Sequence, residues 1–352
     1  MLNSILSFIF VLGVLIFVHE LGHFITAKLV GIRVERFSLG FPPRMIGKKI
    51  GDTDYCISWL PLGGYVKMAG MVDESMDTTI RGEPWEFQSK PIWQRIIVIS
   101  AGSVMNILTA VVIYAAISYF SGVVNTRVGE VLPGKPAEAL GLQAGDLITA
   151  IDGQPVDSWE ELTKLIHTKP GVELQIEWKR GDQVLQGRVV PELEPTQNIG
   201  LIGIAPAMEY RPVGLFEALR NGVVTSYRVL TLIVQSLKSI VVGEVPFKEA
   251  IGGPLTIFQM TRESAKRGAG TLFTFMAFIS LNLGLLNLLP FPVLDGGHLV
   301  FLFIEAVRRK PLSVKTRLVI QQIGMAFLLG LMVFVLFNDI RRWDTIKELF
   351  KF

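Results

Sequence analysis

The stretch FVHELGHF, residues Phe17–Phe24, places metal-binding side chains inside a segment that is apolar enough to cross a membrane. On a helix, His19 and His23 lie four residues apart on one face, so their imidazoles can bind one zinc ion, and Glu20 lies beside them. A zinc site with one position open for water needs a third protein ligand, which another part of the chain has to provide. Histidines at this spacing also occur by chance as solvated or capping residues. Ionisable groups at membrane depth are costly and usually functional, which favours the metal site.

Composition indicates an integral membrane protein. Half of the 352 residues are hydrophobic and only 18% are charged. The net charge of +3 is spread along the chain without basic blocks, so nothing indicates nucleic-acid binding. Cys56 is the only cysteine, which excludes an internal disulfide and a cysteine-based zinc site. A metal therefore has to be bound by histidine and carboxylate side chains.

Apolar runs predict four transmembrane segments, at about residues 3–27, 96–120, 272–307 and 318–337. A signal peptide is the alternative for the first run, but no basic residue precedes it and no cleavage pattern follows it, so we expect it to be retained. Residues 28–95 are rich in Lys and Arg, which places this loop in the cytoplasm and the amino terminus outside.

A β-hairpin is predicted inside this loop, at about residues 35–70. Tyr55–Leu60 and Tyr65–Met68 flank the turn sequence PLGG and form its expected arms. Their apolar side chains indicate that the hairpin dips toward the membrane, where irregular backbone is tolerated only against protein or a wet cavity. A cytoplasmic hairpin that packs on itself is the alternative, and these residues alone do not decide between the two.

After Gly122 the sequence changes to short apolar strands separated by turn signals, with helix-like stretches at residues 137–140 and 159–166. The phrase GLQAGDLITAIDGQPV, residues 141–156, resembles a PDZ domain, and we expect a PDZ-like domain at residues 123–192. PDZ domains bind peptides by strand addition, so the domain implies a peptide or protein ligand, or a filter for the size of substrates.

The third apolar run is interrupted by NLLPFPVLDGGH, residues 287–298. Pro290 and Pro292 remove backbone donors and disfavour helix before them, whereas the glycines that follow relax the chain. A carboxylate in such a break is costly to bury, so Asp295 is the best candidate for the missing metal ligand. In the second apolar run, Asn106 is predicted to be a packing contact.

Residues 193–270 are expected to form a linker that includes an amphipathic helix at 214–243, lying at the membrane interface. A spanning helix is the alternative, and depth argues against it. At about 1.5 Å per residue, the two histidines lie roughly 24 to 30 Å into a hydrocarbon core of about 30 Å. Asp295 reaches the same depth only if helix 214–243 does not cross the membrane, so we predict four crossings and both termini outside.

The motifs HELGH, at residues 19–23, and NLLPFPVLDGG, at residues 287–297, agree with the PDZ phrase between them. Together they resemble the bacterial site-2 proteases of the regulator of sigma E protease type. FSLGF at 37–41 and LGGYVKM at 62–68 match the hairpin of that family. The resemblance implies an α-helical polytopic membrane protein with four transmembrane helices, a membrane-reentrant β-hairpin and one inserted extracytoplasmic PDZ-like α+β domain. The chain departs from the family at Ser103, where proline is common.

The resemblance also implies roles for individual residues. His19, His23 and Asp295 would bind Zn²⁺. Glu20 would be the general base that activates water, and Asn287 would hydrogen-bond the substrate carbonyl or its oxyanion. The hairpin would hold an unwound substrate as an added strand, with contacts at Ile57, Trp59, Gly63, Gly64 and Tyr65.

The implied activity is intramembrane zinc-dependent proteolysis in the bacterial inner membrane, with the PDZ-like domain outside and the hairpin loop on the cytoplasmic side. Its substrates would be single-span membrane proteins of the anti-sigma factor or remnant signal peptide class, cleaved in regulated intramembrane proteolysis. The alternative is a non-catalytic PDZ-bearing membrane scaffold with a structural metal, in which Glu20 is dispensable. A zinc transporter fits less well, because no second chain of polar residues crosses the bilayer. His298 is predicted to be structural, since a fourth protein ligand would close the water position.

Overall fold

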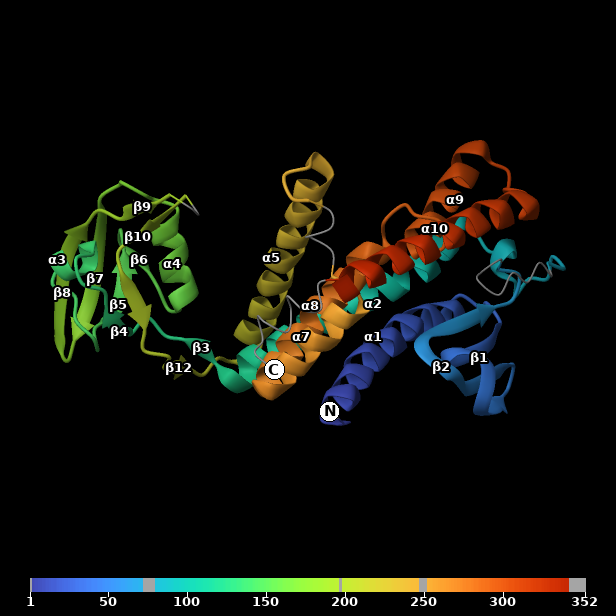
Figure 1. Cartoon of the computed structure of the whole chain (residues 1–352), viewed down its shortest axis with the longest axis horizontal. Helices are drawn as coiled ribbons and strands as arrows, with labels where there is room; N and C mark the ends of the chain where they lie inside the picture. Colours follow the sequence, from blue (N-terminus) through green and yellow to red (C-terminus); the bar gives the residue numbers. More distant parts are fainter. Residues whose placement is uncertain (1, 72–79, 196–197, 247–251, 342–352) are drawn as a thin grey trace. The chain divides into compact units, whose positions relative to one another are not determined.

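The protein forms two compact units in the computed structural model, which describes residues 2–71, 80–195, 198–246 and 252–341. The first unit comprises Met1–Ala115 and Asn221–Phe352, and the second comprises Ala116–Arg220. Each unit is described by itself below. Figure 1 labels their helices and strands.

Four helices in the described part of the first unit are long and apolar enough to cross a membrane. They are α1 (Leu2–Leu29), α2 (Ile92–Ser121), α8 (Ala269–Asn287) and α10 (Val314–Arg341). Three of them cover the predicted segments and extend them at both ends. The third differs, because α8 ends at Asn287 and a separate helix, α9 (Asp295–Arg308), begins eight residues later. The predicted break is therefore confirmed, and the crossing predicted at 272–307 is two helices, of which only α8 is a candidate span.

Helix α1 lies at the centre of the packing in this unit. Its first half buries Val11 and Leu15 against Phe275, Met276 and Ile279 of α8. Its second half packs against a β-sheet, which Figure 1 shows beside it. A further helix, α7 (Pro254–Lys266), packs against α1, α8 and α10. Packing against α7, α8 and the sheet thus fixes the helix that carries His19 and His23.

The sheet is formed by β1 (Val34–Ile50) and β2 (Thr53–Met68), which connect through a turn at Gly51. Residues 34–39 of β1 are in register with residues 64–68 of β2 on one side and with 54–57 on the other. The predicted pairing was wrong. The two expected arms do not pair with each other, because residues 34–39 of β1 lie between them. The predicted turn at PLGG is also absent, because β2 continues through these residues. The pairing is set by long-range packing of Phe37 on the aromatic rings of α1.

The second unit contains a four-stranded antiparallel sheet in the order β6-β5-β7-β8, together with helix α4. Its core buries Ile148, Leu162, Leu174 and Ile176 completely. The elements are β3 (Val123–Val124), β4 (Val128–Val131), α3 (Pro136–Ala139), β5 (Leu147–Ile151), β6 (Gln154–Pro155), α4 (Trp159–His167), β7 (Leu174–Arg180), β8 (Gln183–Val189), β9 (Glu192–Glu194), β10 (Ile199–Leu201), β11 (Ile204–Pro206) and β12 (Tyr210–Arg211). Both predicted helices are present. Strand β11 pairs with β4 and lies beyond residue 192, so this unit continues past the predicted domain end.

Helix α5 (Leu215–Val242) corresponds to the predicted amphipathic helix at 214–243. Among the described helices it is not one of the four that are apolar enough to span a membrane. Its position at a membrane interface stays a prediction. A short 3₁₀ helix, η1 (Phe87–Ser89), precedes α2.

Candidate metal centre

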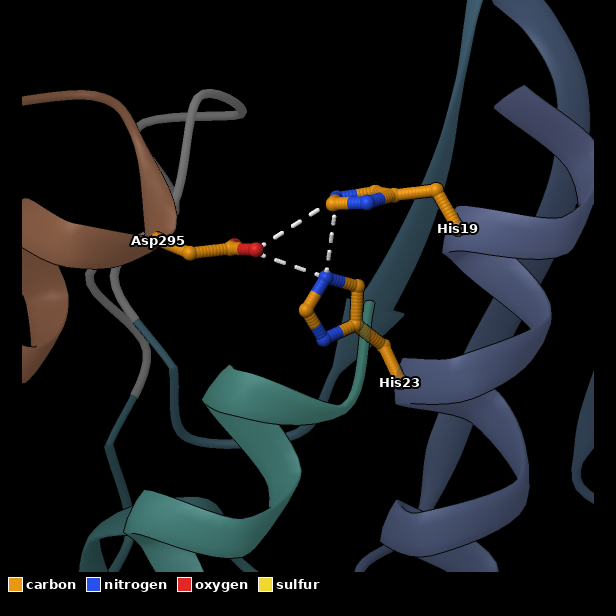
Figure 2. A group of neighbouring side chains, drawn as sticks. All are labelled: His19, His23 and Asp295. Atoms are coloured by element: carbon orange, nitrogen blue, oxygen red, sulfur yellow. Dashed lines mark hydrogen bonds and ion pairs between the residues drawn. The ribbon is translucent and has the colours of Figure 1, made fainter. Parts of the chain in front are cut away.

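The three predicted metal ligands come together in the first unit. His19 and His23 lie on one face of α1 with their Nε2 atoms 3.2 Å apart. The carboxylate of Asp295 reaches them from α9, with Oδ2 3.5 Å from Nε2 of His19 and Oδ1 3.4 Å from Nε2 of His23. Figure 2 shows the three side chains pointing toward one another. One ligand atom from each lies within 4.8 Å of the others, and no second group of this kind occurs in the described ranges.

Asp295 owes its position to the turn between α8 and α9. Val293 adopts a positive φ of 82°, which is unusual for a β-branched residue and costs on the order of 1–3 kcal/mol. A Cβ at Gly296 or Gly297 would overlap backbone carbonyl groups of the same turn. Glu305, further along α9, is buried between Arg95 of α2 and Arg317 of α10 and forms ion pairs with both. The glycines allow the turn to close, and the buried ion pairs fix α9 against its neighbours.

The chemistry of the donor set fits zinc. Nδ1 of His23 lies 2.8 Å from the carbonyl oxygen of Val98, which can only accept, so Nδ1 carries the proton and Nε2 is available to a metal. Two imidazole nitrogens and one carboxylate are a usual ligand set for a zinc site with an open position. The space beside these ligands is kept open by Gly102, because a Cβ there would lie 2.8 Å from Nε2 of His19 and would also overlap Nε2 of His23.

Helix α2 contacts all three ligands, which the sequence does not predict. Besides the Val98 carbonyl, Ser103 donates a hydrogen bond from Oγ to Oδ2 of Asp295, at 3.1 Å. The amide of Asn106 lies 3.4 Å from Nδ1 of His19, so its predicted role as a packing contact is incomplete. Val98, Gly102 and Asn106 follow one another at intervals of four, and this spacing is the signal in the sequence that they share one face of α2.

A cavity of about 720 Å³ opens beside the three ligands. Gly63, Gly64 and Tyr65 of β2 line it, as predicted for residues that contact substrate. Ile57 and Trp59 do not line it, and their side chains are 46% and 63% exposed elsewhere on the sheet. Residues 54–57 of β2 pair with residues 36–39 of β1 on one side and with residues 46–49 of β1 on the other. This pairing keeps that part of β2 away from the cavity.

Both predicted catalytic residues lie at this cavity. Glu20 lines it on α1, and Gly64 approaches so closely that a Cβ there would lie 3.0 Å from Cγ of Glu20. Asn287, the last residue of α8, places its amide nitrogen 3.5 Å from Nε2 of His19. His298 also lines the cavity, but it does not belong to the ligand group, and its Nε2 lies 3.4 Å from the amide of Gln321.

Comparison with known proteins gives the family. The model of peptidase family M50 matches residues 7–331. This chain belongs to peptidase family M50. The regulator of sigma-W protease RasP of Bacillus subtilis (strain 168) is 31% identical over an aligned length of 417 residues. The alignment covers 97% of this chain and 99% of RasP.

Two further relatives are also similar to this chain over most of its length. The zinc metalloprotease RasP of Bacillus licheniformis is 32% identical over 422 residues, covering 97% of this chain and 99% of that protein. A relative in Clostridium perfringens (strain 13 / Type A) is 38% identical over 326 residues, covering 93% of this chain and 95% of the relative. A crystal structure of the PDZ domain of an SdrC-like protein from Listeria monocytogenes is 35% identical, covers 25% of this chain and 88% of that domain, and has a TM-score of 0.21.

The family membership confirms the resemblance to site-2 proteases. This M50 peptidase is a zinc metalloprotease, and four helices in the described part of its chain are long and apolar enough to cross a membrane.

Proposed function

We propose that this M50 peptidase hydrolyses a peptide bond within or next to the transmembrane segment of single-span membrane proteins. The observation that carries the proposal is the position of His19, His23 and Glu20 within α1, a helix apolar enough to span the membrane. A protease whose metal-binding group lies at membrane depth acts on peptide bonds at that depth. The name of the RasP relative, a regulator of sigma-W protease, supports anti-sigma factors as a substrate class, beside remnant signal peptides.

Each residue of the site has a proposed task. Zinc bound by His19, His23 and Asp295 would polarise the scissile carbonyl and make a water molecule more acidic. Glu20 takes the proton from that water and delivers it to the leaving amine. The amide of Asn287 donates a hydrogen bond to the carbonyl oxygen as negative charge develops there, which is worth about 2.7–4 kcal/mol for a comparable donor.

An unwound substrate would bind as an extended strand along residues 63–66 of β2. Helical peptide bonds are protected by their own hydrogen bonds, so the substrate has to unwind before it is cut. Residues 64–68 of β2 are registered with β1 on one side, and residues 63–66 line the cavity. These observations favour Gly63, Gly64 and Tyr65, rather than Ile57 and Trp59, as the residues to which the substrate strand is added.

We place both termini and the PDZ-like domain outside the bacterial inner membrane, and the β1–β2 sheet on the cytoplasmic side as a membrane-reentrant element. Two observations support this topology. The loop between α1 and α2 is rich in Lys and Arg, and Asp295 lies beside the two histidines, as the depth argument requires. The PDZ-like domain would bind a peptide or exclude substrates with bulky outer domains.

The deciding experiment compares the wild type with Glu20→Gln, purified in detergent, for zinc content and for cleavage of a model single-span substrate. We expect zinc to be retained and cleavage to fall by about 10²- to 10⁴-fold, because the variant lacks the general base but keeps the ligands. Glu263→Gln on α7 is the matched control. Cleavage by Glu20→Gln at the wild-type rate would show that Glu20 is not the base. Wild-type activity on soluble peptides alone would contradict the intramembrane substrate.

A further inference from the structure

The two carboxylate oxygens of Asp295 are in different surroundings. Oδ2 accepts the hydrogen bond from Ser103, at 3.1 Å, and lies 3.5 Å from Nε2 of His19. Oδ1 lies 3.4 Å from Nε2 of His23. Ser103 is completely buried, so no solvent competes for its hydroxyl group. The Ser103 hydroxyl therefore fixes Oδ2, whereas Oδ1 faces His23.

The direction of the Ser103 hydroxyl is informative because other hydroxyl groups on α2 point elsewhere. Ser100 donates to the carbonyl of Ile96, and Thr109 donates to the carbonyl of Met105, each four residues earlier on the same helix. This is the usual arrangement of hydroxyl side chains in an apolar helix. Ser103 instead donates across to α9. Its contact with Asp295 thus ties the ligand to α2.

A carboxylate can bind a metal through one oxygen or through both. If both oxygens of Asp295 bound zinc, the protein would supply all four ligand atoms of a four-coordinate site, and water or substrate could bind only as a fifth ligand. A hydrogen bond to Oδ2 takes up electron density and fixes the carboxylate plane, and such outer contacts orient metal ligands.

We propose that Ser103 is a positioning residue that keeps Asp295 bound to the metal through Oδ1 alone and so preserves one coordination position for water or substrate. This inference rests on the proposed role of Asp295 as a metal ligand.

The test uses Co²⁺ in place of zinc, because the intensity of its visible absorption falls as the coordination number rises from four to five. The full-length protein is stripped of metal in detergent and titrated with Co²⁺ for the wild type, Ser103→Ala and Ser103→Thr. We expect Ser103→Ala to give a weaker, higher-coordinate spectrum and a metal affinity lower by about 10- to 100-fold. Ser103→Thr keeps the hydroxyl group and is expected to retain the wild-type spectrum.

Two control variants make the outcomes distinct. Ser100→Ala removes a hydroxyl group that bonds only within α2, and it is expected to leave the spectrum unchanged. A wild-type spectrum for Ser103→Ala, or an equal change in Ser100→Ala, would overturn the role of Ser103. A wild-type spectrum for Asp295→Ala would instead overturn the proposed ligand set itself.

Discussion

Replacing Gly102 by alanine is expected to weaken zinc binding without unfolding α2. The Cβ of the new residue would lie 2.7 Å from Cε1 and 2.8 Å from Nε2 of His19, and closer still to Nε2 of His23. Non-bonded heavy atoms prefer separations of about 3.5–4.0 Å. The methyl group would overlap both ligand nitrogens on the side where they face each other, which is the space that a shared metal needs.

The magnitude follows from the cost of inserting one methyl group into a packed site, which is about 1–3 kcal/mol. Every 1.4 kcal/mol is a factor of about ten in an equilibrium constant, so zinc affinity should fall by roughly 5- to 140-fold. The helix itself should tolerate the change, because alanine favours a helix interior over glycine by about 1 kcal/mol. A lower zinc affinity with an intact helix content is therefore the expected result.

The assay is a competition of purified protein and a chelator for zinc, read together with the helical circular dichroism signal. Gly330→Ala is the matched control, because Gly330 lies in α10 and a Cβ there meets nothing within 4 Å. It should bind zinc like the wild type. Wild-type zinc affinity in Gly102→Ala would refute the geometry of the site, since the two histidines could then not share a metal at this place.

Three further predictions test other parts of the molecule. Asn287→Ala should lower cleavage by about 10²- to 10³-fold and leave zinc content unchanged, whereas an equal loss of zinc would make Asn287 a structural residue. In the second unit, burial raises the pKa of Asp146 but its hydrogen bonds to Arg180 and the backbone lower that pKa further, so the net pKa is below the usual value. The charged carboxylate then contributes stability above its unfolded pKa of about 3.9, which is lost as pH falls through the lower folded pKa. Thermal unfolding of Asp146→Asn should lack this loss, and an unchanged acid dependence would contradict the assignment. In a cysteine-free background, Arg267→Cys should be labelled from outside and Lys310→Cys from the cytoplasm, and the reverse labelling would invert the proposed topology.

The grouping of His19, His23 and Asp295 could be predicted from the sequence because each of these residues carries a local signal. His19 and His23 stand four residues apart in an apolar helix, and Asp295 stands in a helix that two prolines interrupt. Both signals depend only on neighbouring residues. The structure adds their distances and the turn that holds Asp295, in which Val293 adopts a positive φ.

The strand arrangement could not be predicted in the same way. The residues PLGG predict a turn between two strands, but β2 runs through them without ending. A strand's course and its partner depend on residues far along the chain. Here residues 34–39 of β1 lie between the two arms of β2, because Phe37 packs on Phe17 and Phe24 of α1. Ile57 therefore does not line the cavity, although it belongs to the same strand as Gly64.

The contribution of α2 was hidden for a different physical reason. Its apolar residues surround the helix almost evenly, so the sequence does not indicate which face meets α1. Small and polar residues on such a helix are typical of ordinary helix packing, which was the prediction for Asn106. The carbonyl of Val98 accepts the hydrogen bond of His23. Because Gly102 and Asn106 follow Val98 at intervals of four residues, they lie on the same side of α2. A single helix then provides the acceptor that sets one ligand's tautomer, the glycine that leaves space for the metal and the hydroxyl that orients the carboxylate. Substitutions on this face should therefore alter metal binding more than helix stability. Substitutions elsewhere on α2 should alter helix stability more than metal binding.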